Sequence, residues 1–363
     1  MADLVAATRV LASVQSGDAH RLWSCQPEEL VEEDQRPFAV TGTFYASPTE
    51  DAVFIGYQGR LARLDSLDGR QQSVVNTEKA DLWFSDVWQT LTPDGKTLIQ
   101  ADDQAITAMD VASGKKLWRY KNRDKEDMFG RAAPSVGPDG TVYFGTTRGA
   151  VYAVREGKKV WKAETRVFGR AAPAIGPDGK VYVGLLGSSE KQPIFVLDAA
   201  TGKEERQLPL KESLESEPWV GADNSLYLKL SGGVASVNPQ SGAENWRVKN
   251  PRRDEVLGPS PGPDGQLYFS TRKGLLLAVE PAGGQVTWQT DTGERLDSGP
   301  QVDRHGALYV LDHEGQVQAF ARDKAALLAA HANLAALQAA GPSIGVLGRH
   351  LVVGGVRLAM RSH

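Results

Sequence analysis

The chain has 363 residues, of which 41% are hydrophobic and 24% are charged, and its formal net charge is −4. This composition is typical of a globular protein with a sizeable core, and it gives no support for a nucleic-acid or anionic-membrane partner. The single cysteine, Cys25, excludes an intrachain disulfide, and the sequence has no run of about 18 apolar residues that could span a bilayer.

Residues 1–15 form the first predicted element, a short amphipathic helix with apolar residues at Leu4, Val5, Val10, Leu11 and Val14. The segment has neither a basic start nor an unbroken apolar run, so it does not have the pattern of a signal peptide. We therefore expect a cytoplasmic location, or a periplasmic one if the chain is a processed form. The remaining residues, 16–363, are expected to form a single domain.

An internal repeat fills most of that domain. The stretch "RAAPSVGPDGTVYFG" begins at Arg131, and "RAAPAIGPDGKVYVG" begins at Arg170. When the sequence is aligned on the turn that ends in "PDG", eight copies of the repeat can be recognised. The first lies around Tyr45 and the last around Pro342, and successive copies are 39 to 45 residues apart. A repeat of this length is typical of a β-propeller blade.

Each copy contains signals for four strands. The turn "GPDG" suits a tight hairpin, and short apolar runs such as "TVYFG" and "AVYAV" suit strands that are buried on both faces. A Gly-containing turn leads to a fourth run that often ends in tryptophan. A proline recurs in the first strand, where an inner edge tolerates the missing N–H donor. The sequence therefore predicts an all-β, eight-bladed propeller of four-stranded antiparallel blades, with seven blades as the alternative.

The pattern "DG-x-(L/V)-Y-(F/V)-G … G-K-x-x-W" resembles the PQQ-like propeller repeat over residues 38–361. That family includes the quinoprotein alcohol dehydrogenases and cofactor-free scaffolds such as the lipoprotein of the outer-membrane barrel assembly machine. The resemblance implies that the tryptophans dock between neighbouring blades, which agrees with the large area that an indole ring buries. The docking candidates are Trp23, Trp118, Trp161, Trp246 and Trp288. Arg206 and Ser73 take the tryptophan place in two other blades, which are expected to be looser at the rim.

The two ends of the domain are expected to meet. The last copy, at 341–361, has residues for three strands, and "HRLW" before Cys25 resembles "KKLW" at 115–118. We predict that residues 20–26 supply the missing fourth strand of that last blade. Residues 323–339 are rich in Ala and Leu and predict a helical insertion. That helix either packs on the propeller or docks a partner through Leu327, Leu334 and Leu337.

Catalytic signals are weak. The resemblance to quinoproteins would require an adjacent cysteine pair and a calcium ligand set, which the sequence does not provide, so no PQQ or other cofactor is expected. The six histidines are scattered without zinc spacing, and His305 and His313 are interpreted as solvated loop residues rather than ligands. No metal site and no catalytic residue is predicted.

One group of polar residues remains as a candidate site. Nine residues before the turn residue, where the first strand enters the channel, five copies carry a charge: Asp86, Arg131, Arg170, Glu215 and Asp297. These side chains either form salt bridges that close the channel mouth or build a patch on Arg131 and Arg170 that binds an anion or a partner. The function predicted is a monomeric, non-enzymatic scaffold for unidentified protein partners; the alternative is a ligand binder or degenerate quinoprotein that uses the channel mouth.

Overall fold

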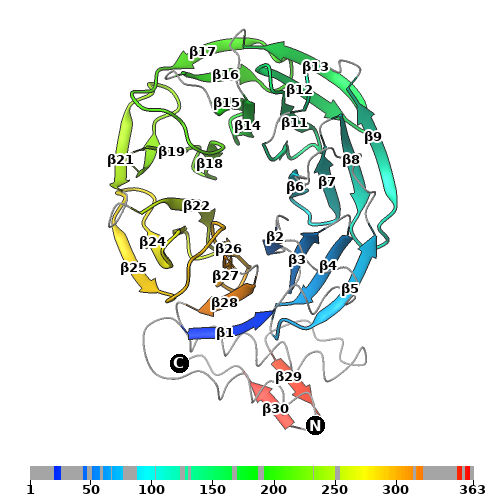
Figure 1. Ribbon diagram of the computed structural model, residues 1–363, viewed down its shortest axis with the longest axis vertical. Helices are drawn as coiled ribbons and strands as arrows, with labels where there is room; N and C mark the ends of the chain where they lie inside the picture. The colour runs from blue at the N-terminus through cyan, green and yellow to red at the C-terminus, as the bar shows by residue number, and fades with distance from the viewer. Residues whose placement is uncertain are drawn as a thin grey trace.

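Seven four-stranded antiparallel sheets are arranged as blades around a central axis in a computed structural model of the chain (Figure 1). The model describes residues 20–25, 44–46, 51–57, 60–66, 68–76, 88–102, 104–122, 127–129, 132–165, 170–186, 192–231, 233–249, 254–313, 316–321, 350–353 and 356–359. The predicted propeller is confirmed, and its blade number is seven rather than eight. No helix occurs in these ranges, and the helices predicted at 1–15 and 323–339 lie outside them.

Blades 1 to 6 follow the chain, each running from the axis outward. Blade 1 is β2 (Phe44–Ala46), β3 (Ala52–Tyr57), β4 (Arg60–Asp65) and β5 (Gln71–Asn76); blade 2 is β6 (Trp88–Leu91), β7 (Thr97–Ala101), β8 (Ala105–Asp110) and β9 (Lys116–Lys121); blade 3 is β10 (Ser135–Val136), β11 (Val142–Gly145), β12 (Ala150–Arg155) and β13 (Lys158–Glu164). Blade 4 is β14 (Arg170–Ile175), β15 (Lys180–Leu186), β16 (Ile194–Asp198) and β17 (Glu204–Leu208); blade 5 is β18 (Trp219–Val220), β19 (Leu226–Leu230), β20 (Gly233–Val237) and β21 (Glu244–Lys249); blade 6 is β22 (Val256–Pro261), β23 (Leu267–Thr271), β24 (Leu275–Val279) and β25 (Val286–Asp291).

Blade 7 joins the two ends of the ring. It contains β26 (Gln301–Val302), β27 (Ala307–Leu311) and β28 (Val317–Ala321), and its outer strand is the N-terminal β1 (His20–Cys25). The pairing runs from His20 opposite Ala321 to Cys25 opposite Val317. Closure by an N-terminal strand is confirmed, but the strand completes the blade at 301–321 and not the copy at 341–361.

The described part of the eighth sequence copy is a two-stranded sheet and not a four-stranded blade. Its two described strands, β29 (His350–Val353) and β30 (Val356–Ala359), pair with each other in a separate two-stranded sheet. The sequence count was wrong because β1 takes the fourth place in blade 7, so the ring closes before the eighth copy is reached.

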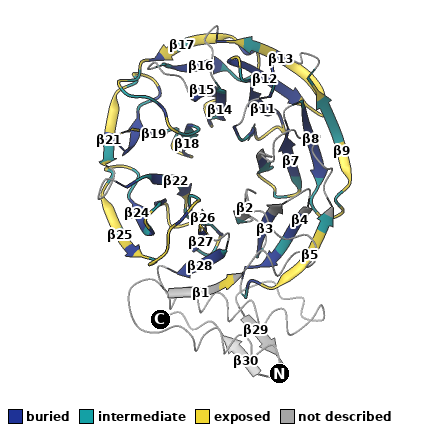
Figure 2. Cartoon of the chain, viewed as in Figure 1, coloured by how far each residue is buried: buried dark blue, intermediate teal, exposed yellow. Residues whose placement is uncertain are grey.

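Burial follows strand position within each blade. The second and third strands are buried along most of their length, as in β11 and β20, whereas outer strands such as β25 are largely exposed (Figure 2). The unbroken apolar runs of the sequence therefore lie in the strands that are covered on both faces by neighbouring blades.

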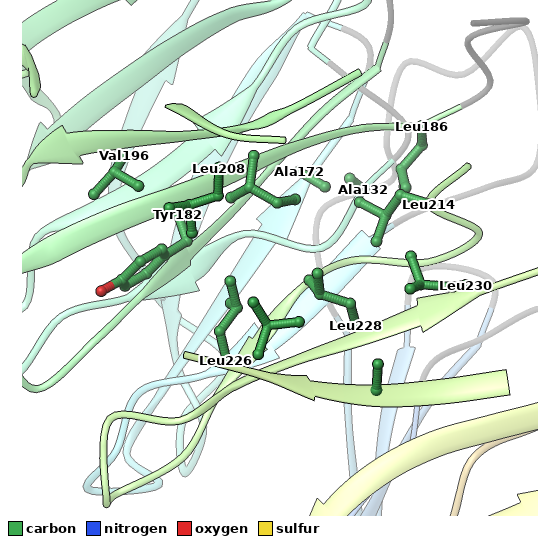
Figure 3. Close-up of a cluster of buried hydrophobic side chains, with 13 residues drawn as sticks. Ala132, Ala172, Tyr182, Leu186, Val196, Leu208, Leu214, Leu226, Leu228 and Leu230 are labelled. Atoms are coloured by element: carbon green, nitrogen blue, oxygen red, sulfur yellow. The ribbon is translucent and has the colours of Figure 1, made fainter. Parts of the chain in front are cut away.

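The hydrophobic core lies between the blades. Seven clusters of buried side chains are present, one at each interface around the ring, including the interface between blades 7 and 1. Figure 3 shows the cluster between blades 4 and 5, where Tyr182 of β15 lies beside Leu226 and Leu228 of β19. Each blade is thus held by two apolar interfaces, and the closing interface has the same construction as the others.

The repeated turn is an architectural device. In blade 4, Asp178 accepts hydrogen bonds from the Lys180 backbone N–H (3.2 Å) and from the Tyr182 hydroxyl (2.7 Å). Burial and the nearby carboxylate raise the pKa of Tyr182, which keeps its hydroxyl protonated as the donor. Blade 6 repeats the bond between Tyr268 and Asp264 at 2.9 Å. The letters "D-G-x-x-Y" therefore connect a turn to the buried tyrosine beneath it.

Outer-strand side chains join each blade to the next. The Trp161 indole N–H donates to the Ala199 carbonyl of blade 4 at 2.9 Å, and Trp246 donates to the Pro281 carbonyl of blade 6 at 2.6 Å. The Trp161 ring packs on Gly202, which has a φ of +71°; a Cβ there would lie 2.6 Å from the ring. Trp118 and Trp288 are half-buried against the cores between blades 2 and 3 and between blades 6 and 7.

Arg206 occupies the tryptophan place of blade 4 and also reaches the next blade. Its Nη2 donates to the Pro239 carbonyl of blade 5 at 2.9 Å, in the same way as the indoles of Trp161 and Trp246. A guanidinium can therefore supply the same donor as an indole, and the looser rim of blade 4 stays a prediction. Ser73, at this place in blade 1, is exposed.

Every outer strand contains a β-bulge immediately before this docking position. The register shifts before Trp118, Trp161, Arg206, Trp246 and Trp288, each of which pairs with a residue of the third strand. In blade 7 the shift lies between Arg21 and Trp23, which places Trp23 opposite Ala319 in the same register. Blade 1 has its shift before Ser73. Such bulges interrupt the hydrogen-bonding edge of an outermost strand.

Polar groups add to the closing interface on the face that carries the "GPDG" turns. Asp51 of blade 1 accepts bonds from Arg304 Nε (3.0 Å) and contacts His305 Nε2 at 2.6 Å. The hydrogen bond to Asp51 raises the pKa of His305, which favours the charged imidazole. His305 is therefore half-buried at the interface between blades 7 and 1, and its interpretation as a solvated loop residue was wrong.

Candidate functional site: the mouth face of the propeller

The candidate site lies on the mouth face, defined here as the end of the propeller that carries the connections between blades and the hairpins between second and third strands. Arg170 begins β14, whereas Glu215 and Asp297 lie in the connections before β18 and β26. Asp86 and Arg131, the other predicted members, lie outside the described residues. The described members come from three different blades and do not contact one another.

Arg170 and Glu215 differ in their surroundings. Arg170 is half-buried and has no side-chain partner among the described residues, and Glu215 is exposed, with its backbone N–H donating to the Lys229 carbonyl at 2.9 Å. Of the two, only Glu215 is largely open to solvent. Their binding role stays a prediction.

Asp297 belongs to an alternating series of charges that crosses blades 5, 6 and 7. Lys229 Nζ lies 2.7 Å from Glu255 Oε1, and the other oxygen of Glu255 contacts Arg272 Nε. Arg272 Nη1 lies 2.8 Å from Asp297 Oδ1, and Arg295 Nε lies 3.8 Å from the same oxygen. We call these five residues, Lys229, Glu255, Arg272, Asp297 and Arg295, the charge chain.

Strands or their ends hold three members of the charge chain, and Asp297 and Arg295 lie in the connection between β25 and β26. Lys229 is in β19 and Arg272 directly follows β23, whereas Glu255 immediately precedes β22. The backbone N–H of Arg272 donates to the Glu255 carbonyl at 3.0 Å, so the two residues are joined through main chain as well as side chain. The main-chain bond therefore holds the Glu255 and Arg272 side chains side by side.

Electrostatics within the charge chain favour ionisation. Burial opposes ionisation of Glu255, but hydrogen bonds from Lys229 and Arg272 outweigh this effect and lower its pKa. The bond to Glu255 in turn raises the pKa of Arg272. Lys229 has only 7% of its side chain exposed, so loss of Glu255 would leave a nearly buried ammonium group without this carboxylate partner.

Two carboxylates that sequence reasoning missed brace the hairpins of this face. Asp127 accepts the Arg148 backbone N–H at 3.1 Å, and Asp254 accepts the Lys273 backbone N–H at 2.9 Å. Both aspartates are buried. They precede their hairpins by 21 and 19 residues, so no fixed spacing in the repeat marks them. The hairpins between second and third strands are thereby anchored to the preceding connection.

The charged side chains described on the mouth face do not form a cluster of metal ligands. Across the described ranges, no three His, Cys, Asp or Glu side chains are placed to hold a metal ion. No helix in the same ranges is long and apolar enough to cross a membrane. What the mouth face offers is a fixed pattern of positive and negative groups over several blades.

Comparison with known proteins gives the family. The sequence matches the model of outer membrane protein assembly factor BamB over residues 21–168 and 230–355. The crystal structure of BamB from Moraxella catarrhalis is 18% identical, with a TM-score of 0.53, and the match covers 84% of this chain and 98% of that one. At 18% identity, this similarity is evidence for the fold and not for a shared function. No curated protein matches the chain significantly. Because the family match spans most of the sequence, the chain belongs to the family of outer membrane protein assembly factor BamB, within the PQQ-like propellers.

Proposed function

We propose that this protein is a non-enzymatic scaffold that binds a protein partner through its mouth face. The charge chain is the observation that carries the proposal. It presents alternating charges from three blades, and main-chain bonds and braced hairpins hold them in place. Fixed charges of both signs guide the orientation of a protein partner and reject partners with the wrong pattern.

Family membership supports the same assignment. The matching model describes an assembly factor, and the crystal structure of BamB from Moraxella catarrhalis has a similar fold. Within the PQQ-like propellers, the chain therefore groups with scaffold members rather than with dehydrogenases. We propose that its partner is a protein with charges complementary to Arg170, Glu215 and the charge chain.

The test is affinity capture from the native host with cross-linking and mass spectrometry. The double variant Arg170→Glu with Arg295→Glu changes two residues of the mouth face, and Arg295 has 61% of its side chain exposed, so folding should be preserved. We expect the variant to lose the cross-linked partner while its Tm stays within a few degrees of the parent.

A matched control changes charge elsewhere. Lys203→Glu with Lys96→Glu alters exposed lysines in turns on the opposite face, in blades 4 and 2, and gives the same change in net charge. Capture should survive in this control. Equal capture by the parent and the mouth variant, with cross-links outside the mouth face, would show that the charges only join neighbouring blades.

A further inference from the structure

The outer sides of blades 2 and 3 carry an unusual surface that the mouth face does not include. Leu117 has 54% of its surface exposed and Val160 has 43%, and both are bulge residues that precede a docking tryptophan. Exposed Lys115, Lys158 and Lys159 flank them. We call these five residues the rim patch.

The two halves of the rim patch form one surface. Gly157, in the turn that precedes Lys158, packs on Trp118 of the neighbouring blade: a Cβ at Gly157 would lie 3.2 Å from the Trp118 Cβ. The turn of blade 3 therefore lies directly on the outer strand of blade 2. Figure 1 shows β9 and β13 following each other along the outside of the ring.

Charge is concentrated at this part of the rim. Residues 115–121, "KKLWRYK", contain four basic residues and no acid, although Arg119 pairs with Asp102. Residues 158–164, "KKVWKAE", contain three lysines and one acid. The corresponding stretch of blade 4, "KEERQL", is balanced, and that of blade 6, "VTWQTD", is acidic. The overall charge of −4 therefore conceals a basic rim on two adjacent blades.

Edge protection does not explain this concentration. Lysines on an outer strand discourage strand pairing between molecules, but all seven blades have such a strand and all seven already have a bulge. A protective device would not combine lysines with exposed Leu117 and Val160, which make an edge more adhesive. The combination indicates a binding surface.

The chemistry favours a lipid surface over a peptide. The bulges at Leu117 and Val160 interrupt the strand edge that an added β-strand would need. The patch lies on the outside of a ring and uses lysines, which act as point charges and do not select planar bidentate partners. Lysines around exposed aliphatic side chains suit headgroups that carry diffuse negative charge, with the aliphatic groups entering the interface.

We propose that the rim patch binds peripherally to membranes that contain anionic phospholipid. Lys115, Lys158 and Lys159 would lie at the headgroups, and Leu117 and Val160 would enter the interface without spanning the bilayer. This binding site is separate from the mouth face and does not depend on the proposed protein partner. A scaffold held in this way could keep its mouth face free.

Vesicle co-sedimentation of the full chain tests the proposal. We expect binding to vesicles of equal parts phosphatidylcholine and phosphatidylglycerol, little binding to phosphatidylcholine alone, and release at high salt, since surface charges are screened. Each lysine contributes about fivefold to binding of an anionic surface. Lys115→Glu with Lys158→Glu should therefore weaken binding by at least about twenty-fold.

Matched controls come from the outer strands of other blades and the turns before them. Lys203 also follows the turn glycine before an outer strand, so Lys203→Glu with Lys249→Glu gives equal charge change on blades 4 and 5 and should leave binding nearly intact. Val286, 46% exposed in β25, is the control for the apolar contribution. Leu117→Ser with Val160→Ser should weaken binding, and Val286→Ser should not.

Several results would overturn the proposal. These are no preference for phosphatidylglycerol, an equal loss in the control and rim variants, or binding to soluble polyglutamate but not to vesicles. The last result would assign the rim patch to an acidic polypeptide, and concentration-dependent self-association abolished by the rim variants, without vesicle binding, would assign it to a second copy of the chain.

Discussion

Removal of residues 1–26 should open the propeller. The deletion strips β1 from blade 7 and leaves the edge of β28 without its partner strand. Five residue pairs join β1 to β28, from His20 opposite Ala321 to Cys25 opposite Val317. With roughly one backbone hydrogen bond for each pair, at about 0.5–1.5 kcal/mol net, the loss is on the order of 3–7 kcal/mol.

That loss is comparable with the whole stability of an ordinary domain, about 5–15 kcal/mol. We therefore expect the chain 27–363 to aggregate or to unfold at much lower urea concentration, as followed by size-exclusion chromatography and circular dichroism. The chain 16–363, which keeps β1, is the control and should behave nearly as the full protein does. Equal urea midpoints for 27–363 and the full chain would refute closure by β1.

Three other perturbations have expected outcomes. Trp161→Phe keeps an aromatic ring but removes the donor to Ala199, so urea unfolding should show a loss of about 1 kcal/mol; Trp161→Ala, which also leaves a cavity, should lose about 3–5 kcal/mol. The pKa of His305 is raised above 6.5 in the fold, so its contact with Asp51 stabilises fully below pH 6.5 and is lost as pH rises through the raised value. The difference in Tm between the parent and His305→Gln should therefore shrink at alkaline pH. Addition of PQQ and calcium should produce no dye-linked dehydrogenase activity with alcohols or sugars, and turnover would contradict the non-enzymatic assignment.

The blades could be predicted from sequence because their contacts are local. The hairpin signals at "GPDG" and the apolar runs after it place each strand beside its neighbour within about 40 residues, which is the repeat length itself. Asp178 and Tyr182 illustrate this: the bond between them spans four positions and recurs as Asp264 with Tyr268. Strand identity and order therefore followed from patterns within a single repeat.

The blade number and the mouth face depend on contacts that no single repeat contains. β1 pairs with β28 almost 300 residues away, so only the three-dimensional ring decides which copy it completes. On the mouth face, Asp297 was among the charged residues predicted nine positions before the turn. Its partners Arg272 and Arg295 come from a hairpin and a connection, which have no fixed position in the repeat. The connections differ in length from blade to blade. The positions of their side chains relative to one another therefore cannot be predicted from the repeat.

The distinction between repeated and unrepeated residues separates architecture from function in this fold. Asp178 and Tyr182 recur as Asp264 and Tyr268 because blades 4 and 6 have the same turn to close, and the tryptophan dock of Trp161 recurs at Trp246 because each of these blades has a neighbour to bind. Lys229 and Arg272 have no such requirement: the charge chain crosses only blades 5, 6 and 7. The rim patch likewise occupies only two blades. Residues that maintain a ring must be distributed around it, and the gathering of charges on one arc is the reason why we propose binding there.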